Sequence, residues 1–294
     1  MRKLERQFGD FVIPYGMAKP GGYGIQAERI FKLLRRWIPA FAGMTRKKSF
    51  IIPPMTSSTT IPHHVAIIMD GNRRWARSHG WQAIKGHEYV VDHILEPLVD
   101  RCIELGIEYL TLWAFSTENW QRDRLELEGM MQLFRRAFTH KIEELNAKGV
   151  RFRIIGNIDK FPKDIAIQAK DWVEKSAHNT KITVNFALNY GGREEILGAV
   201  NAILKEREEE KKRGRENDEL VGSQEFESHL STAGIPDPDL IIRPGGQLRL
   251  SGFLPWQSVY SELYFTDVLM PEFTVEELDK ALEDYANRQR RFGK

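Results

Sequence analysis

A short apolar segment, Val65 to Met69, constrains the fold of this chain more than any other stretch. Its uninterrupted run of apolar, largely β-branched residues is typical of a strand buried on both faces, as in a parallel sheet. The run ends at the turn-forming triplet Asp70-Gly71-Asn72, and a basic, helix-compatible segment follows from Arg73 to Arg77. Strand, tight turn and helix start in this order predict the first unit of an open α/β sheet, in which ligands bind beyond the carboxyl ends of the strands.

The rest of the chain repeats this alternation of strands and helices. Apolar runs predict further strands at 107–115, 151–156, 181–188, 240–243 and 259–265. Apolar residues at helical spacing predict helices at 89–105, 125–145, 163–177, 194–205 and 275–288. We therefore expect an α/β fold with a central, mostly parallel six-stranded sheet and helices on both faces. The mixed-charge run 206–219 fits a solvated helix extension or a loop.

The junction after the first strand has the composition of an anion site. Backbone N–H groups at a helix start, with Arg73, Arg74 and Arg77 beside them, favour binding of an anion such as phosphate. Asp70 is an acid in this basic cluster, and a metal ion that bridges its carboxylate to a phosphate would account for both signs of charge. The alternative is a plain turn followed by a solvated helix, and spacing alone leaves both open.

Polar residues also follow three other predicted strands, at 116–122, 189–193 and 243–251. Because the carboxyl ends of parallel strands share one edge of the sheet, these clusters can converge with Asp70 on one ligand.

The third of these clusters predicts a second phosphate site. Arg243, Arg249 and Ser251 supply polar groups, and Gly245 and Gly246 permit close approach of the backbone. A flexible loop explains the glycines equally well. Two anion sites and one carboxylate suggest two phosphorylated substrates.

Composition and charge exclude several other classes. The single cysteine, Cys102, allows neither a disulfide nor a cysteine metal site within one chain. No apolar run is long enough to span a membrane. Residues 1–54 hold eleven Lys or Arg and three acids, a net charge of +8. Because the whole chain has a net charge of +2, residues 55–294 carry −6 and are unsuited to binding nucleic acid. No Gly-rich nucleotide-binding motif, GxGxxG or GxxxxGK(S/T), follows a predicted strand, which weakens a nucleotide-binding interpretation.

The first 55 residues form a separate region, with the folded domain expected at 56–294. Ala27 to Ile38 is basic and amphipathic, which could indicate a membrane-surface or targeting segment. We favour an N-terminal extension without packed structure, upstream of the true start, because Met55 would be a natural initiator.

Four motifs, MDGNRRWAR, AFSTENWQR, RPGG followed by R-x-S, and SELYFTD, occur in this order. They resemble the successive signatures of the cis-prenyltransferase family, most of all its bacterial undecaprenyl diphosphate synthase (isoprenyl transferase) members. The resemblance runs from about His63 to Gly293. It implies a homodimeric, Mg²⁺-dependent enzyme that condenses isopentenyl diphosphate onto an allylic diphosphate such as farnesyl diphosphate. The implied product is a long-chain polyprenyl diphosphate such as undecaprenyl diphosphate, a precursor of the lipid carrier for cell-wall glycans.

The resemblance also implies roles for individual residues. Asp70 matches the essential aspartate that helps to hold Mg²⁺, and Glu262 matches a second Mg²⁺ ligand. Asn119 matches the proposed proton acceptor; an amide is a poor base, so we interpret it as positioning the departing proton. Substrate binding is implied for Gly71, Asn72, Arg73, Arg74, Trp75, His87, Ser116, Thr117, Glu118, Trp120, Arg122, Arg243, Arg249, Leu250 and Ser251. The tail 291–293 resembles one that reaches a neighbouring active site in the dimer.

The chain departs from the family pattern at two positions. Ala83 stands where the family usually has an arginine four residues before His87, and Lys85 or Arg73 are the candidates to supply the missing charge. Pro244 replaces a common threonine and stiffens its loop.

Two alternatives remain within the family. One is a short-chain cis-prenyl diphosphate synthase, although the small Ala114 favours a deep tunnel and therefore a long product. The resemblance implies that the apolar face of 125–145 forms one wall of this tunnel. The other is a non-catalytic partner subunit, but such relatives lose the aspartate and much of the phosphate cradle that this chain keeps. A trans-type enzyme is excluded because its DDxxD motif needs adjacent aspartates, which this chain lacks. We expect a cytoplasmic protein, with peripheral contact at the inner face of the membrane during product release left open.

Overall fold

The computed structural model describes residues 61–214 and 219–288. The N-terminal extension 1–55 and the tail 291–293, both singled out from the sequence, lie outside the described residues.

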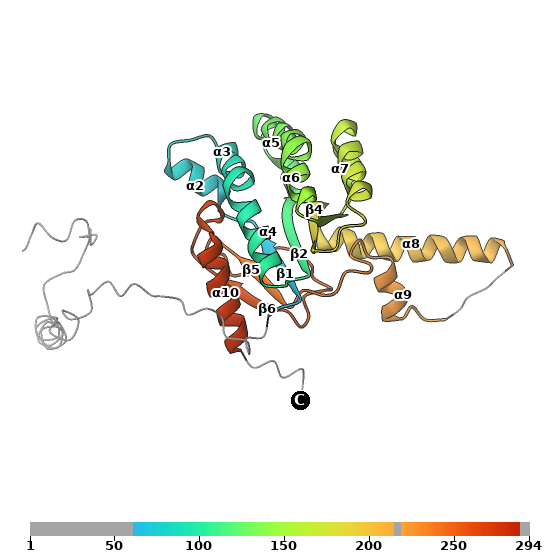
Figure 1. The fold of residues 1–294 in the computed structure, drawn as a ribbon. Helices are drawn as coiled ribbons and strands as arrows, with labels where there is room; N and C mark the ends of the chain where they lie inside the picture. The colour runs from blue at the N-terminus through green and yellow to red at the C-terminus, as the bar shows by residue number, and fades with distance from the viewer. Residues whose placement is uncertain (1–60, 215–218, 289–294) are drawn as a thin grey trace, which may run out of the picture. The chain divides into compact units, whose positions relative to one another are not determined.

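A six-stranded sheet forms the centre of the fold (Figure 1). Its strands are β1 (His64–Ile68), β2 (Tyr109–Ser116), β3 (Val150–Ile155), β4 (Ile182–Tyr190), β5 (Leu240–Arg243) and β6 (Glu262–Phe265). Their order is β3-β4-β2-β1-β5-β6, and within the described ranges every pairing is parallel. The predicted six-stranded parallel sheet is therefore confirmed. The last strand begins later than predicted, because Ser261 N–H donates to the Ser258 carbonyl in a turn at 3.1 Å.

α-Helices connect successive strands, except between β5 and β6. They are α2 (Asn72–Ser78), α3 (Ile84–Tyr89), α4 (Leu95–Glu104), α5 (Arg124–Arg136), α6 (Ile142–Ala147), α7 (Lys163–Lys175), α8 (Gly192–Lys212), α9 (Ser223–Ser228) and α10 (Val275–Asn287). Two of the predicted helices contain a π-helical segment, Val90–Ile94 between α3 and α4 and Ala137–Lys141 between α5 and α6. None of these helices, within the described part of the chain, is long and apolar enough to cross a membrane.

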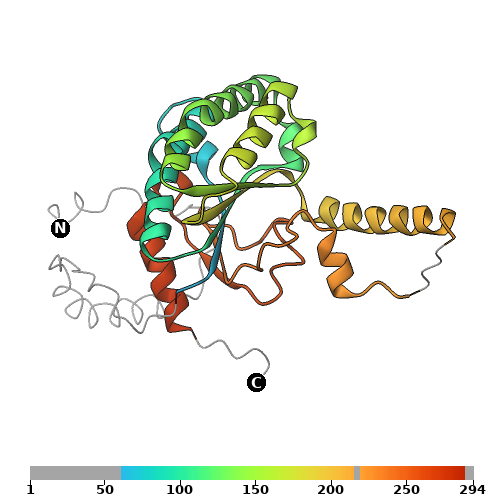
Figure 2. The ribbon, with the colours of Figure 1, turned by 45° about the vertical axis from the view of Figure 1, so that its right-hand side comes forward.

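The two faces of the sheet are covered differently. Val65 and Ile67 point to one face, where helices α4, α5, α7 and α10 complete the largest core cluster. Figure 2 shows α5, α6 and α7 stacked over the sheet on this side. Ala66 and Ile68 point to the opposite face, because side chains alternate along a strand. There they pack against Phe253, in the irregular segment between β5 and β6.

The topology brings the predicted polar clusters together. β1 lies between β2 and β5, so the residues that follow these three strands share one edge of the sheet. A close helix contact adds a fourth element: a Cβ on Gly86 would lie 2.0 Å from the carbonyl oxygen of Asn72, so only glycine lets α3 pack this tightly on α2. That contact brings His87 to the same edge.

Candidate active site

Asp70 lies at the centre of a polar pocket beyond the carboxyl end of β1. Its Oδ2 accepts a hydrogen bond from Arg243 Nη2 at 2.9 Å, and its Oδ1 accepts from Arg74 Nη2 at 3.3 Å. Gly71 N–H also donates to Oδ1, at 2.6 Å. Gly245 has a φ of 94°, and a Cβ there would lie 2.5 Å from Arg74 Nη2. The glycine therefore makes room for this arginine beside the carboxylate.

Arg243 joins Asp70 to the loop that follows β5. The residue is buried, and its Nη1 donates to Ser251 Oγ at 2.9 Å and to the carbonyl of Arg249. Its Nε has no hydrogen-bond partner among the described side chains. A buried guanidinium needs a charged partner, and here Asp70 supplies it.

A buried glutamate that the sequence analysis missed pairs with two arginines of the pocket. Glu126 Oε1 lies 2.9 Å from Arg122 Nη1 and 3.3 Å from Arg73 Nε. It therefore holds two guanidinium groups side by side, which their mutual repulsion would otherwise oppose. The only signal in the sequence was an acid four residues after Arg122, on one face of a helix.

His87 stands beside these arginines. Its Nε2 lies 3.4 Å from Arg122 Nη1. Burial, followed by the charges of Arg122 and Arg73, lowers the pKa of His87 to about 3. Without a bound anion, the imidazole is therefore neutral at physiological pH.

Two amides border the pocket in different ways. Asn72 donates from Nδ2 to the Met69 carbonyl at 2.8 Å, while its buried Oδ1 has no hydrogen-bond partner among the described residues. Asn119 Oδ1 accepts from Ser116 N–H at 3.1 Å in a capping box of the 3₁₀-helix Thr117–Gln121. The side chain of Asn119 thus orders its own segment. Ser116, Glu118 and Asn119 line the same pocket as Asp70.

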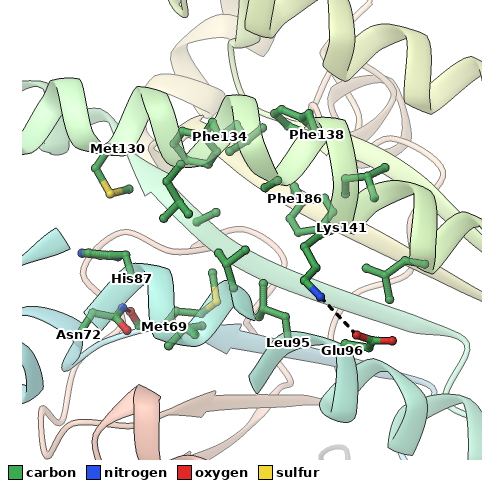
Figure 3. Close-up of a pocket in the computed structure, with 18 residues that line it drawn as sticks. Met69, Asn72, His87, Leu95, Glu96, Met130, Phe134, Phe138, Lys141 and Phe186 are labelled. Atoms are coloured by element: carbon green, nitrogen blue, oxygen red, sulfur yellow. Dashed lines mark hydrogen bonds and ion pairs between the residues drawn. The ribbon is translucent and has the colours of Figure 1, made fainter. Parts of the chain in front are cut away.

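An apolar cavity opens from this polar pocket (Figure 3). Its cavity volume is about 90 Å³, and Met69, Asn72, His87 and Ala114 line both spaces. Its walls are lined by Val90, Val91, Leu95, Met130, Leu133, Phe134, Ala137, Phe138, Ile142, Leu145, Phe186 and Leu188. The apolar stripe predicted on 125–145 therefore lines a cavity, and both π-helical segments contribute to it. Figure 3 shows His87 and Asn72 at one end and the ion pair of Lys141 and Glu96, 3.7 Å long, at the other.

Several residues implied by the resemblance lie away from the polar pocket. Trp75 is buried in an aromatic cluster, with its ring centroid 4.7 Å from that of Tyr89. Arg249 is exposed, and its Nη1 donates to Gln247 Oε1 at 2.6 Å. Leu250 packs against the core cluster on the opposite face of the sheet.

Two further residues, Thr117 and Trp120, line a different pocket. This pocket is bordered by β4 and α8.

Glu262 does not meet Asp70 within this chain. In the sheet, Glu262 pairs with Leu240, which in turn pairs with Val65 at the amino end of β1. Asp70 lies five residues beyond Val65, which is roughly 15 Å along the strand direction. The Glu262 carboxylate instead pairs with Arg288, at 2.8 Å. In the described part of the chain, no cluster of three or more His, Cys, Asp or Glu residues could hold a metal ion.

Comparison with known proteins identifies the family. The family model described as "Putative undecaprenyl diphosphate synthase" matches residues 68–293. An isoprenyl transferase of Clostridium perfringens is 43% identical over 233 residues, which cover 79% of this chain and 90% of the relative. The isoprenyl transferase of Thermotoga maritima is 46% identical over 233 residues, which cover 79% of this chain and 97% of the relative.

Two solved structures are similar. Lavandulyl diphosphate synthase from Lavandula x intermedia, in complex with dimethylallyl diphosphate, gives a TM-score of 0.75 at 34% identity, over 80% of this chain and 99% of that one. A probable undecaprenyl diphosphate synthase from Campylobacter jejuni gives a TM-score of 0.63 at 29% identity, over 80% of this chain and 100% of that one. With its six-stranded parallel sheet and the arginine-lined pocket at the sheet edge, this chain belongs to the undecaprenyl diphosphate synthase family of cis-prenyltransferases, and it is a transferase.

Proposed function

We propose that this enzyme condenses isopentenyl diphosphate units onto an allylic diphosphate, such as farnesyl diphosphate, to give a long-chain polyprenyl diphosphate of the undecaprenyl type. One observation supports this above all: a pocket that joins Asp70 to a set of arginines shares Met69, Asn72 and His87 with an apolar cavity. A diphosphate with a hydrocarbon tail has the same division into a charged head and an apolar chain. The product would serve as precursor of the lipid carrier for cell-wall glycans.

The allylic diphosphate would bind where the cavity meets the pocket. Arg73, Arg74 and Arg122 line this region together with Gly71, Asn72 and His87. Guanidinium groups suit this task because they bind phosphate oxygens in a bidentate manner and stay charged. The hydrocarbon would then extend past Met69 and Ala114 into the cavity.

The incoming isopentenyl diphosphate would bind on the β5 side of Asp70. Arg243 and Ser251 are already in contact there, and the exposed Arg249 stands at the edge of the same loop. The reacting carbons of the two substrates would therefore meet above Asp70, between the two sets of arginines.

The donor set at Asp70 fits Mg²⁺ bound jointly with substrate. Mg²⁺ is usually held by one or two carboxylates together with phosphate oxygens and water, so a protein cage of several acids is not required. Asp70 supplies a carboxylate, and the free Oδ1 of Asn72 could accept a hydrogen bond from a metal-bound water. When bound, the ion would neutralise charge on the departing diphosphate. Glu262 could contribute a ligand only if a second chain brought it to the pocket.

The chain's own residues account for the remaining steps. As the C–O bond of the allylic diphosphate breaks, the arginines stabilise the departing negative charge. The apolar cavity keeps water from the allylic cation, which then forms a C–C bond to the isopentenyl unit. Asn119 would position the proton that the isopentenyl unit loses. Each cycle would push the growing chain deeper into the cavity.

The length of the product must be argued from this cavity, since the solved relatives are named for both undecaprenyl and lavandulyl products. The cavity volume of about 90 Å³ is below that of ordinary ligand pockets, which span about 300–1,000 Å³, so a long chain would have to widen the cavity as it grows. The small Ala114 where the cavity meets the pocket favours a long chain. The second candidate is a shorter cis-prenyl product, which is favoured by the Lys141–Glu96 ion pair at the far end of the cavity.

A second copy of the chain is the proposed partner. Leu197, Val200 and Leu204 lie at helical spacing on α8, and 61%, 40% and 60% of their surfaces are exposed. Val259 and Tyr260 are each 70% exposed. Exposed apolar residues in such a stripe favour an interface between copies, consistent with a homodimer.

The decisive experiment is a product-length assay. Purified protein would be incubated with farnesyl diphosphate, labelled isopentenyl diphosphate and Mg²⁺, and the dephosphorylated products separated by length. We expect a ladder that ends near the undecaprenyl length. A stop after one or two additions would establish the short-chain alternative. Absence of incorporation by folded, dimeric protein would overturn the catalytic proposal.

A further inference from the structure

Asn189, near the end of β4, has an unusual backbone conformation and a fully engaged side chain. Its φ is 48°, in the left-handed region that residues other than glycine rarely adopt. Only 8% of the residue is exposed. Its Oδ1 accepts a hydrogen bond from Trp120 Nε1 at 2.8 Å, and its Nδ2 donates to the Asn157 carbonyl at 3.0 Å. Strained residues of this kind persist where the surrounding structure holds them, and they cluster at functional sites.

Trp120, the donor of the first of these hydrogen bonds, belongs to a segment that borders the polar pocket. Trp120 belongs to the 3₁₀-helix Thr117–Gln121, which also carries Glu118 and Asn119. These two residues line the pocket around Asp70. A 3₁₀-helix of five residues has few and poorly aligned internal hydrogen bonds, so contacts from outside add to the Asn119 capping box in fixing its position.

The ring of Trp120 provides such contacts on its apolar side. It packs edge-on against Phe115 and Phe161, with centroid distances of 4.9 and 5.4 Å. Both of these rings contact Phe134, which lines the apolar cavity. The indole is thus held by apolar packing on one side and by a single polar anchor, Asn189, on the other.

We propose that Asn189 is a positioning residue for prenyl transfer. It fixes the indole of Trp120 and, through it, the segment 116–121, so that Glu118 and Asn119 face the polar pocket. The left-handed backbone takes Asn189 out of the strand pleat and aims its amide at Trp120 and Asn157. This inference rests on the proposed function, because the reaction being positioned is the one proposed above.

Two substitutions separate this role from a merely structural one. Asn189→Gly adopts the left-handed conformation without strain and removes both side-chain hydrogen bonds. Trp120→Phe keeps an aromatic ring in the cluster and removes the N–H donor, together with part of the ring system. We would measure hydrogen exchange of the peptide covering 116–121 by mass spectrometry without substrate, and kcat and KM for isopentenyl incorporation, for each variant and for the double variant.

We expect Asn189→Gly to speed exchange in 116–121 at least tenfold and to lower kcat at least tenfold, with a smaller change in KM. In the Trp120→Phe background the same substitution should add less than twofold to either effect. Trp172→Phe is the matched control, because it removes an indole bond of 2.6 Å to the Phe138 carbonyl in another part of the core. It should leave exchange in 116–121 unchanged.

Unchanged exchange in Asn189→Gly, or additive effects in the double variant, would overturn the inference. The exchange measurement needs no turnover. If the unaltered protein incorporated no isopentenyl unit, the proposed function would fail separately. The difference in exchange between Asn189→Gly and the unaltered protein would still decide whether Asn189 fixes this segment.

Discussion

Asp70 Oδ2 and Arg243 Nη2 lie 2.9 Å apart although 173 residues separate them in the sequence. The contact joins the carboxyl end of β1 to that of β5, and it places one carboxylate between two groups of arginines. The two residue clusters that the sequence predicts as anion sites therefore meet at Asp70, through its contacts with Arg74 and Arg243. Asp70 is the residue that both clusters share, so changes in its charge should affect both substrates.

The first prediction concerns this shared carboxylate. Asp70→Asn keeps the shape of the side chain but removes the negative charge that would hold Mg²⁺ and face Arg243. We expect kcat to fall at least about 100-fold, as for other groups that stabilise transition-state charge. The loss of a charged hydrogen bond should lower the free energy of unfolding by only about 1–3 kcal/mol. Isopentenyl incorporation and urea unfolding measure the two effects, and full activity in this variant would contradict the assigned role.

The fold and the centre of this site could be predicted because their signals are local. The apolar run Val65 to Met69 marks a buried strand, and Asp70 and Arg243 directly follow strands whose ends meet in any parallel sheet. The place of Glu262 relative to Asp70 is not given by local signals. Its position depends on the register between β6 and β5, which the sequence of either strand alone does not specify.

Side-chain packing was the second obstacle. Trp75 follows the predicted diphosphate site directly, yet its ring is buried against Tyr89 because α3 packs on α2. Glu126 was missed for the opposite reason, since an acid on a helix next to arginines is usually a solvated surface residue. Only the tertiary structure shows that it is buried between Arg73 and Arg122.

A second prediction tests the junction between pocket and cavity. Ala114 lines both spaces, so a larger side chain there should narrow the path of the growing hydrocarbon. We expect Ala114→Leu to shift the product ladder to shorter lengths while the first additions continue. Because slow turnover also shortens products at early times, the ladder must be read at several time points. A distribution that reached the original length on long incubation would argue against this position as a constriction.

Ala83 offers a gain-of-function test. It is the N-cap residue of α3, one helical turn before His87, so a side chain at 83 projects on the same helix face as the imidazole. Ala83→Arg should therefore add a positive charge beside the allylic diphosphate and lower its KM several-fold. The effect should weaken with added salt, because exposed charges are screened. Ala83→Gln is the uncharged control, and an unchanged KM in the arginine variant would indicate that Lys85 or Arg73 already supplies this charge.

A fourth prediction concerns the N-terminal region. The family match begins at residue 68, and the relatives cover about four-fifths of this chain. A variant that starts at Met55 should therefore keep the kcat, KM and melting temperature of the full chain. A large loss of activity or of thermal stability would show that the first 54 residues contribute to the enzyme.

The last prediction follows from a buried histidine in the core. His64 is 2% exposed, with Nε2 2.7 Å from Thr111 Oγ1 and Nδ1 2.7 Å from the Pro236 carbonyl. Burial is the main reason that its pKa falls to about 4. Between about pH 6.5 and pH 4 the unfolded chain takes up a proton at this position while the folded protein does not, so stability must fall as the pH falls.

This histidine alone should account for a loss of about 2 kcal/mol in the free energy of unfolding between pH 7.5 and pH 5.0. Urea unfolding at the two pH values measures the change. His87, whose pKa is also lowered, acts in the same direction, so the variant His64→Gln is needed to separate the two. Glutamine can form hydrogen bonds but does not titrate. The free energy of unfolding of His64→Gln should therefore fall by about 2 kcal/mol less between the two pH values than that of the unaltered protein. An equal loss in both proteins would mean that protonation of His64 is not what destabilises the fold in acid.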